Sequence, residues 1–201
     1  MTFRASEMRL ELIRADMQNA GIRVHLPAQC GTARLSLQLD IGVGDAVWPD
    51  PVLNSYPSLL DAHTSQVFAY SRETVVAEKF EALVVLGDRN SRIKDFFDLH
   101  MLASTFEFDR RQLTESIRRT FERRGTPIPV RSPIGLTPAY WKNPSRPAQV
   151  RAFAQRAGLV TSEHVAADIT SVLADFLLPL LDDLRAGITS PGEWAPRGPW
   201  A

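Results

Sequence analysis

The most constraining feature of this chain is an alternation of apolar and polar residues over Arg34–Val43. Apolar side chains occupy every odd position from Leu35 onward, and the polar residues, Asp40 among them, occupy even positions. Successive side chains of a strand point to opposite faces of a sheet. This period of two therefore predicts a β-strand whose apolar face lies against a core and whose polar face looks the other way.

The segments around this strand predict an α+β fold. Residues 5–20 are spaced as an amphipathic helix that Gly21 ends, and Ile22–Leu26 alternate as a short strand. From Ser71 onward the apolar spacing is mostly helical. The further expected strands are 56–60 and 66–70, and the expected helices are 72–87, 92–104, 110–124, 137–142, 145–156 and 162–186.

These elements group into an expected core at residues 1–70, a helical domain at 71–187 and a tail at 188–201. The tail contains three prolines, two glycines and two tryptophans, and we expect it to be loose.

Composition limits the protein class. The chain has 201 residues, is 44% hydrophobic and carries no formal net charge, so we expect a packed core and no global attraction to nucleic acid or membrane. Cys30 is the single cysteine, which excludes a disulfide within the chain and a zinc site of several thiolates. No apolar run reaches the roughly 18 residues of a membrane span, and no secretory signal is evident. We expect a cytoplasmic protein.

Asp40 is the first candidate for chemistry. It lies on the polar face near the carboxyl end of its strand, where α/β proteins favour ligand sites, and its carboxylate could hold a divalent metal. The alternative, an ordinary solvent-facing aspartate on an edge strand, is the commoner case.

Two helices supply further candidates. Lys79 lies among apolar and acidic neighbours, as either a phosphate clamp or a surface lysine paired with Glu78 or Glu81. On helix 92–104, charged side chains share one narrow sector of an otherwise apolar surface. Such a sector needs a partner, which is either a functional ligand or a structural ion-pair network. Its members are Lys94, Asp95 and Asp98.

An arginine-rich region offers a basic surface for RNA, although paired residues on a solvated helix face explain it more simply. Its members are Arg110, Arg111, Arg118, Arg119, Arg123, Arg124 and Arg131. The histidines lack metal-ligand spacing, and His100 is expected in the core.

The order of these segments is more specific than any one of them. Leu39–Asp45 is followed by Val76–Leu83, then by Arg92–Leu99 with its Lys-Asp-x-x-Asp run, and then by Thr120–Pro129. This arrangement resembles the AbiEii/AbiGii nucleotidyltransferase toxin family of abortive-infection and toxin–antitoxin systems. The resemblance covers nearly the whole chain up to about Leu184.

The resemblance implies a partial nucleotidyltransferase-like α/β core followed by a mainly helical domain. It also implies transfer of a nucleotide from an NTP, with Mg²⁺ or Mn²⁺, to RNA such as tRNA or to protein. Carried over by position, the resemblance implies that Asp40 (also as the metal ligand), Lys79 and Asp95 are catalytic, and that Lys79, Lys94 and Asp98 contact the nucleotide. We expect the three catalytic residues to converge on one cleft. A cognate antitoxin is an implied partner.

The family opens with a Gly-Ser element and an Asp-x-Asp or Asp-x-Glu pair of metal ligands, and neither precedes Asp40 here. We expect a natural remnant, a truncated product or half of a split protein, with little transfer activity by itself. The shortened sheet is expected to expose an edge that favours self-association or a partner chain. The alternatives to an enzyme are a non-catalytic remnant that binds a partner and an RNA-binding module.

Overall fold

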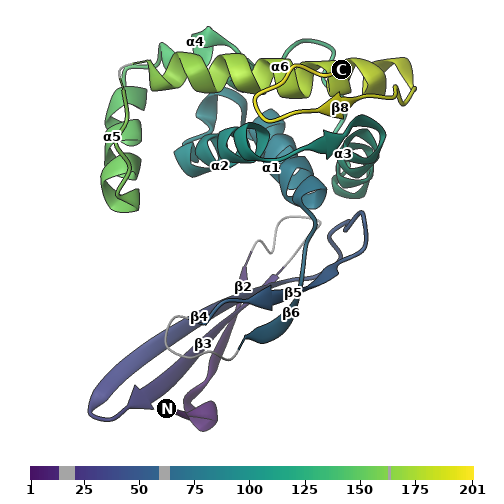
Figure 1. Cartoon of the computed structure of the whole chain (residues 1–201). Coiled ribbons are helices and arrows are strands. Elements are labelled where there is room, and N and C mark those ends of the chain that lie inside the picture. The colour runs from purple at the N-terminus through teal and green to yellow at the C-terminus, as the bar shows by residue number, and fades with distance from the viewer. Residues whose placement is uncertain (14–20, 59–63, 163) are drawn as a thin grey trace. The chain divides into compact units, whose positions relative to one another are not determined.

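The computed structural model describes residues 1–13, 21–58, 64–162 and 164–201. The chain divides into two compact units, Met1–Asp45 and Ala46–Ala201. The division falls earlier than the boundary we expected after residue 70. Strands and helices are both abundant, and the predicted α+β class is confirmed (Figure 1).

The N-terminal unit is a four-stranded antiparallel sheet in which β3 is central. β3 pairs with β4 on one side and with β1 and β2 on the other. The strands are β1 (Thr2–Phe3), β2 (Arg9–Ile13), β3 (Gly21–Cys30) and β4 (Ala33–Gly42), and the short 3₁₀ helix η1 is Ala5–Glu7. A two-residue turn joins β3 to β4, and its first residue is Gly31 at φ 58°. This position suits glycine because the turn that matches strand twist needs a positive φ there.

The predicted helix at residues 5–20 is wrong for residues 5–13. Ala5–Glu7 forms a single 3₁₀ turn and Arg9–Ile13 forms β2. The run Arg9-Leu10-Glu11-Leu12 also has a period of two, and pairing with β3 selects this period over the helical one. Residues 14–20 lie outside the described residues.

The predicted strand at residues 22–26 is present but longer, because β3 continues through Pro27 to Cys30. Proline is tolerated where a strand needs no donor. The carbonyl oxygen of Pro27 accepts a hydrogen bond from the Arg4 amide at 2.9 Å, in the chain between β1 and β2. The break between those two short strands thus accommodates a residue without an N–H group.

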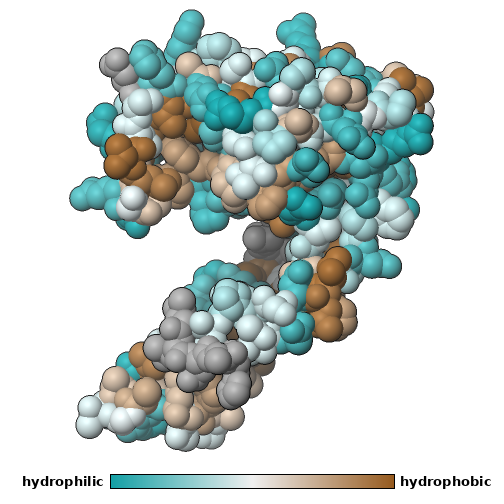
Figure 2. Space-filling view, viewed as in Figure 1, coloured by the Kyte–Doolittle hydropathy of each residue, from teal (hydrophilic) through white to brown (hydrophobic). Residues whose placement is uncertain are grey.

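The predicted strand at residues 34–43 is confirmed as β4, but its apolar face is not buried. Leu35, Leu39 and Ile41 are 40–49% exposed. Of the hydrophobic residues described in this unit, Val24 and Ala28 are the buried ones. Figure 2 shows hydrophobic side chains at the surface of this part of the molecule. The sheet therefore has two distinct faces, and its apolar face is largely open.

The second unit combines six described helices with two small sheets. Its helices are α1 (Arg72–Leu86), α2 (Ile93–Thr105), α3 (Arg110–Arg124), α4 (Pro138–Trp141), α5 (Arg146–Ala157) and α6 (Val165–Ala186). Its strands are β5 (Val52–Tyr56), β6 (Ser65–Ala69), β7 (Phe108–Asp109) and β8 (Glu193–Trp194), and its 3₁₀ helices are η2 (Gly87–Arg89) and η3 (Ile134–Leu136). The helices begin and end within a few residues of the predicted bounds.

The core of this unit forms where α6 crosses the layer made by α1, α2 and α3 (Figure 1). Leu173, Phe176 and Leu180 of α6 are fully buried, as are Phe80 of α1 and Phe96 of α2. Each side chain of this size stabilises the fold by roughly 1.5–3 kcal/mol on burial. This core is built from residues of the second unit alone.

The expectation of a loose C-terminal tail is wrong. β8 pairs with β7, and Trp194 is completely buried. The indole N–H of Trp194 donates to the Ala103 carbonyl oxygen at 2.7 Å, and the Trp200 ring stacks on Phe176 with centroids 5.8 Å apart. The tryptophans supply enough apolar area to order a segment that is otherwise rich in proline and glycine.

Candidate nucleotide-binding site

Lys79 of α1 reaches across to two carboxylates of α2. Its Nζ lies 2.7 Å from Asp95 Oδ1 and 2.7 Å from Asp98 Oδ2. The three side chains are 16–24% exposed, so this cluster is mostly buried. Asp95 and Asp98 both face α1 because residues three apart lie on one side of a helix. The structure thus brings together three of the predicted site residues.

The two acidic neighbours of Lys79 on its own helix bind elsewhere. Glu78 and Glu81 accept hydrogen bonds from the Arg124 guanidinium of α3 at 3.2 and 2.8 Å. The alternative of a surface lysine paired with Glu78 or Glu81 is therefore wrong. Lys79 is directed to α2, while the two glutamates hold α3.

The environment favours the charged forms within this cluster. Burial disfavours the ammonium of Lys79, but hydrogen bonds to Asp95 and Asp98 outweigh burial and raise the pKa of Lys79 above its ordinary 10.5. Burial likewise opposes the charge of Asp98, and hydrogen bonds from Lys79 and Lys94 outweigh it, so the pKa of Asp98 lies below 3.8. At neutral pH Lys79 is a fixed cation, and it cannot serve as a proton acceptor.

Lys94 lies at the solvent side of the same cluster. It binds Asp98 one helical turn away and is 67% exposed. An open groove of about 480 Å³ begins here, between the first turn of α2 and one side of α5. Three basic residues line the groove, namely Arg92, Lys94 and Arg156, and Asp95 is the acidic residue among the lining side chains. The groove therefore favours an anion.

Asp40 belongs to the N-terminal unit and is held by a residue that the sequence analysis missed. Arg23 lies directly opposite on β3 and donates from Nε and Nη2 to the two Asp40 oxygens at 2.7 and 2.8 Å. Gln38 also donates to Asp40, at 3.4 Å. The signal was available, because pairing the strands through a two-residue turn at Gly31 places residue 23 across from residue 40. Convergence of Asp40 with Lys79 and Asp95 stays a prediction.

The carboxylates just described do not form a metal site by themselves. Among the residues that the structure describes, no three His, Cys, Asp or Glu side chains group closely enough to hold a metal ion. Asp40 is occupied by Arg23, and Asp95 and Asp98 are occupied by Lys79. These pairs neutralise the charges that a divalent cation would need.

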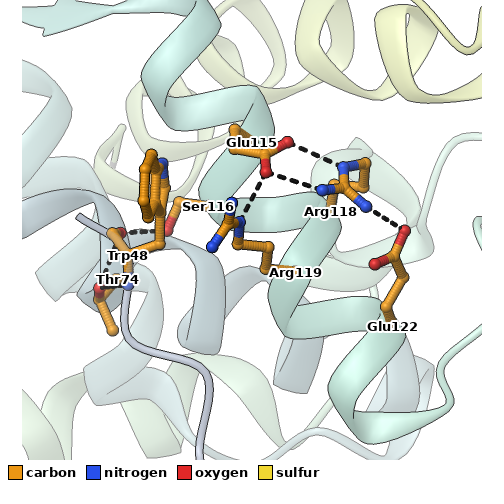
Figure 3. A network of polar contacts seen from close by, with 7 residues as sticks. All are labelled: Trp48, Thr74, Glu115, Ser116, Arg118, Arg119 and Glu122. Atoms are coloured by element: carbon orange, nitrogen blue, oxygen red, sulfur yellow. Dashed lines mark hydrogen bonds and ion pairs between the residues drawn. The ribbon is translucent and has the colours of Figure 1, made fainter. Parts of the chain in front are cut away.

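The arginine-rich region is largely an ion-pair network. Glu115 accepts hydrogen bonds from Arg118 and Arg119, and the Arg119 guanidinium lies 4.0 Å from the Trp48 ring centroid (Figure 3). Arg110 binds the buried Asp183 at 2.8 Å. The interpretation as paired arginines is confirmed for these three and for Arg124.

Trp48 is a further residue that the sequence analysis missed. Its carbonyl oxygen accepts hydrogen bonds from the hydroxyls of Thr74 and Ser116, each at 2.9 Å (Figure 3). These bonds fix the chain before β5 to the start of α1 and to α3.

His100, expected in the core, is 19% exposed and lies 2.8 Å from Asp168 on α6. The contacts of Trp48 and of His100 are both structural within this unit.

Comparison with known protein families identifies the family of this chain. Residues 2–185 match the family described as nucleotidyl transferase AbiEii toxin, type IV toxin–antitoxin system. The chain belongs to this family. No curated protein and no solved structure gives a significant match. The AbiEii match spans both structural units, the β4 strand with Asp40 and the α1–α2 pair with the Lys79 cluster. Across the described ranges, no helix combines the length and apolar character needed to cross a bilayer.

Proposed function

We propose that the groove beside Lys79 binds the phosphates of an NTP, and that this chain serves in transfer of a nucleotide to an RNA or protein acceptor. The observation that carries the proposal is the set of basic side chains Arg92, Lys94 and Arg156 around the groove next to the Lys79 cluster. Arginine and lysine are the side chains that bind phosphate oxygens most strongly, and these three residues are exposed, so a phosphate can reach their charged groups.

Within this proposal Lys79 acts as a cation. Its raised pKa keeps it protonated, so it can attract a phosphate but not remove a proton. A phosphate that reaches Lys79 must compete with Asp95 or Asp98 for its N–H groups. Asp98 keeps Lys94 as a second partner after such an exchange, which favours Asp98 as the carboxylate that is released.

The family suggests a divalent metal as well as the NTP, but the described carboxylates do not fit one. Each is already bound by a cation of this chain, and no third ligand lies beside any pair of them in the described residues. We therefore assign no metal-dependent step here. Mg²⁺ or Mn²⁺, with Asp40 as a ligand, stays a proposal from the family.

The poor fit of the described carboxylates to a metal ion favours a second candidate function. In it the chain is not catalytic and binds nucleotide or a protein partner. Positioning and metal electrostatics supply most of the rate of phosphoryl transfer. A chain that lacks the metal ligands would bind an NTP and transfer little. The antitoxin implied by a type IV toxin–antitoxin family is the protein partner that we propose.

Nucleotide binding is tested by measuring thermal stability and equilibrium binding with ATP, GTP, CTP and UTP, with and without Mg²⁺. Arg92→Ala and Arg156→Ala each remove a charge-assisted hydrogen bond to phosphate and are expected to weaken NTP binding about tenfold. Arg151→Ala is the matched control, because it removes an exposed arginine from α5 outside the groove. Equal binding by all three variants would contradict the proposal.

Transfer is tested by incorporation of labelled nucleotide into total tRNA and into protein. We expect little incorporation by the 201-residue chain, and an increase when a segment bearing Gly-Ser and Asp-x-Asp is supplied in cis or as a separate chain. Asp40→Asn and Lys79→Met should each abolish the restored activity. Strong labelling by the chain alone would show that another carboxylate completes the metal site, and Asp45 is the first candidate.

A further inference from the structure

The long edge strand of the N-terminal unit offers an interaction surface. In the described part of the chain, β4 pairs with β3 and with no other strand. Nine of its ten residues are exposed. An edge strand of this length is a template for pairing with another strand.

The turn determines which backbone groups of β4 face this edge. Cys30 and Ala33 close a two-residue turn, and the closing pair of such a hairpin exchanges both of its hydrogen bonds. The odd-numbered residues of β4 from Ala33 onward therefore bond to β3. The even-numbered residues direct their N–H and C=O groups outward, and these are Arg34, Ser36, Gln38 and Asp40.

These outward residues are self-complementary. If a second copy of β4 lies antiparallel with Leu37 opposite Leu37, then Arg34 lies opposite Asp40 of the second copy and Ser36 lies opposite its Gln38. On the other face, Leu35 lies opposite Leu39 of the second copy. Opposite charges and paired aliphatic side chains directly across two strands are each stabilising.

The backbone allows this register. Hydrogen-bonded pairs in it join even-numbered residues to even-numbered residues, which are the ones with outward groups. A shift by two residues in either direction keeps the hydrogen bonding but removes the charge match, since it sets Arg34 opposite Gln38 or Gly42. The register centred on Leu37 therefore satisfies the backbone and the side chains together.

We propose that this chain forms a symmetric dimer through antiparallel pairing of β4 with β4 of a second copy, about a two-fold axis at Leu37. Four pairs of outward residues then exchange about eight backbone hydrogen bonds. The Arg34 guanidinium of one copy joins Arg23 in facing the Asp40 carboxylate of the other. The proposal does not depend on nucleotide transfer, because it uses residues of the sheet alone.

Cysteine cross-linking tests the register. In a Cys30→Ser background, Leu37→Cys places two thiols at a non-hydrogen-bonded pair, where Cα atoms lie about 4.5 Å apart and a disulfide forms readily. Leu35→Cys is the matched control, because its copy lies four residues, about 13 Å, along the strand. We expect covalent dimer on mild oxidation from Leu37→Cys only. A monomer at every concentration, or equal cross-linking by both variants, would overturn the proposal.

A charge exchange tests the side-chain match without new thiols. Arg34→Asp and Asp40→Arg each set like charges across both ends of the dimer, and each is expected to weaken dimerisation at least about tenfold in sedimentation equilibrium. Mixing the two variants restores both opposite-charge pairs and should restore the dimer. Circular dichroism first establishes that each variant is folded. A dimer that is unchanged by either variant, or no recovery in the mixture of folded variants, would reject this interface.

Discussion

The sheet of residues 1–45 and the helices of residues 46–201 use hydrophobic residues differently. In the helical unit the large side chains of α1, α2, α3 and α6 are buried against one another. In the sheet, Leu10 and Leu12 of β2 are 62% and 73% exposed, and Leu35, Leu39 and Ile41 of β4 are exposed as well. The apolar pattern of β4 thus indicated the type of the element, but it did not indicate what covers that element.

The largest expected contrast is in autonomous folding. Residues 46–201 contain their own core and should unfold cooperatively on heating when produced alone. Residues 1–45 bury too little apolar surface to offset the entropy of ordering and should lack a cooperative transition as a monomer. Calorimetry and circular dichroism on the two fragments provide the measurement. An unfolded 46–201 fragment would show that the helical unit requires the sheet.

The next largest effect is expected for the free energy of unfolding of two substitutions, of a phenylalanine and of a leucine, one in each unit. Phe176→Ala should lower the free energy of unfolding by about 3–5 kcal/mol, because it leaves a cavity beside Phe108 and Trp194. Leu39→Ala on the open sheet face should cost less than about 1 kcal/mol, since about half of the Leu39 side chain is already exposed to water. Denaturant unfolding of the two variants measures both. Similar losses would mean that the sheet face is covered in solution.

The Lys79 cluster should show an intermediate effect. Asp98→Ala leaves Lys79 with Asp95 alone, so we expect a loss of about 1–3 kcal/mol, below the 3–5 of a fully buried pair. Lys94→Ala is the matched control from the same helix and should cost under about 0.5 kcal/mol, because the lysine is 67% exposed. A loss below 1 kcal/mol for Asp98→Ala would place the cluster at the surface.

The smallest expected effect concerns acid stability. Hydrogen bonds from Arg118, opposed by burial and supported by Arg119, lower the pKa of Glu115 from 4.5 to about 2. The stability from this group is complete above pH 4.5 and is lost as pH falls toward about 2. Glu115→Gln should therefore show a smaller loss of stability over that range than the parent chain. Denaturant titrations at several pH values would detect it, and parallel curves would argue against this network.

The helices could be predicted from the sequence because their signals are local. Ser71 caps α1, and Gly125 and Gly187 end α3 and α6 in the left-handed conformation. The segment Arg9–Ile13 was predicted wrongly because its apolar residues fit both the helical period of 3.6 and the strand period of two. Its pairing with β3 makes it a strand. The tail was ordered by tryptophan contacts to residues far along the chain, which no local pattern reports.

From residue spacing, the candidate site was predictable only where its contacts are local in the sequence. The Lys94–Asp98 contact follows from helical spacing, whereas the Lys79–Asp95 contact joins two helices and came from the order of motifs. Arg23 was missed because its role depends on the β3–β4 register. Residue type and spacing thus identified the charged groups, and tertiary pairing determined which charges neutralise each other.

Because Lys79 is mostly buried, its rate of acylation can report on the opening of the α1–α2 pair. The sequence has only three lysines, and Lys94 and Lys142 are exposed while the Lys79 side chain is 19% exposed. Amine acylation requires the deprotonated form, which burial and a raised pKa both make scarce at Lys79. Its rate of modification, read by mass spectrometry against the other two lysines, therefore measures how often α1 and α2 separate.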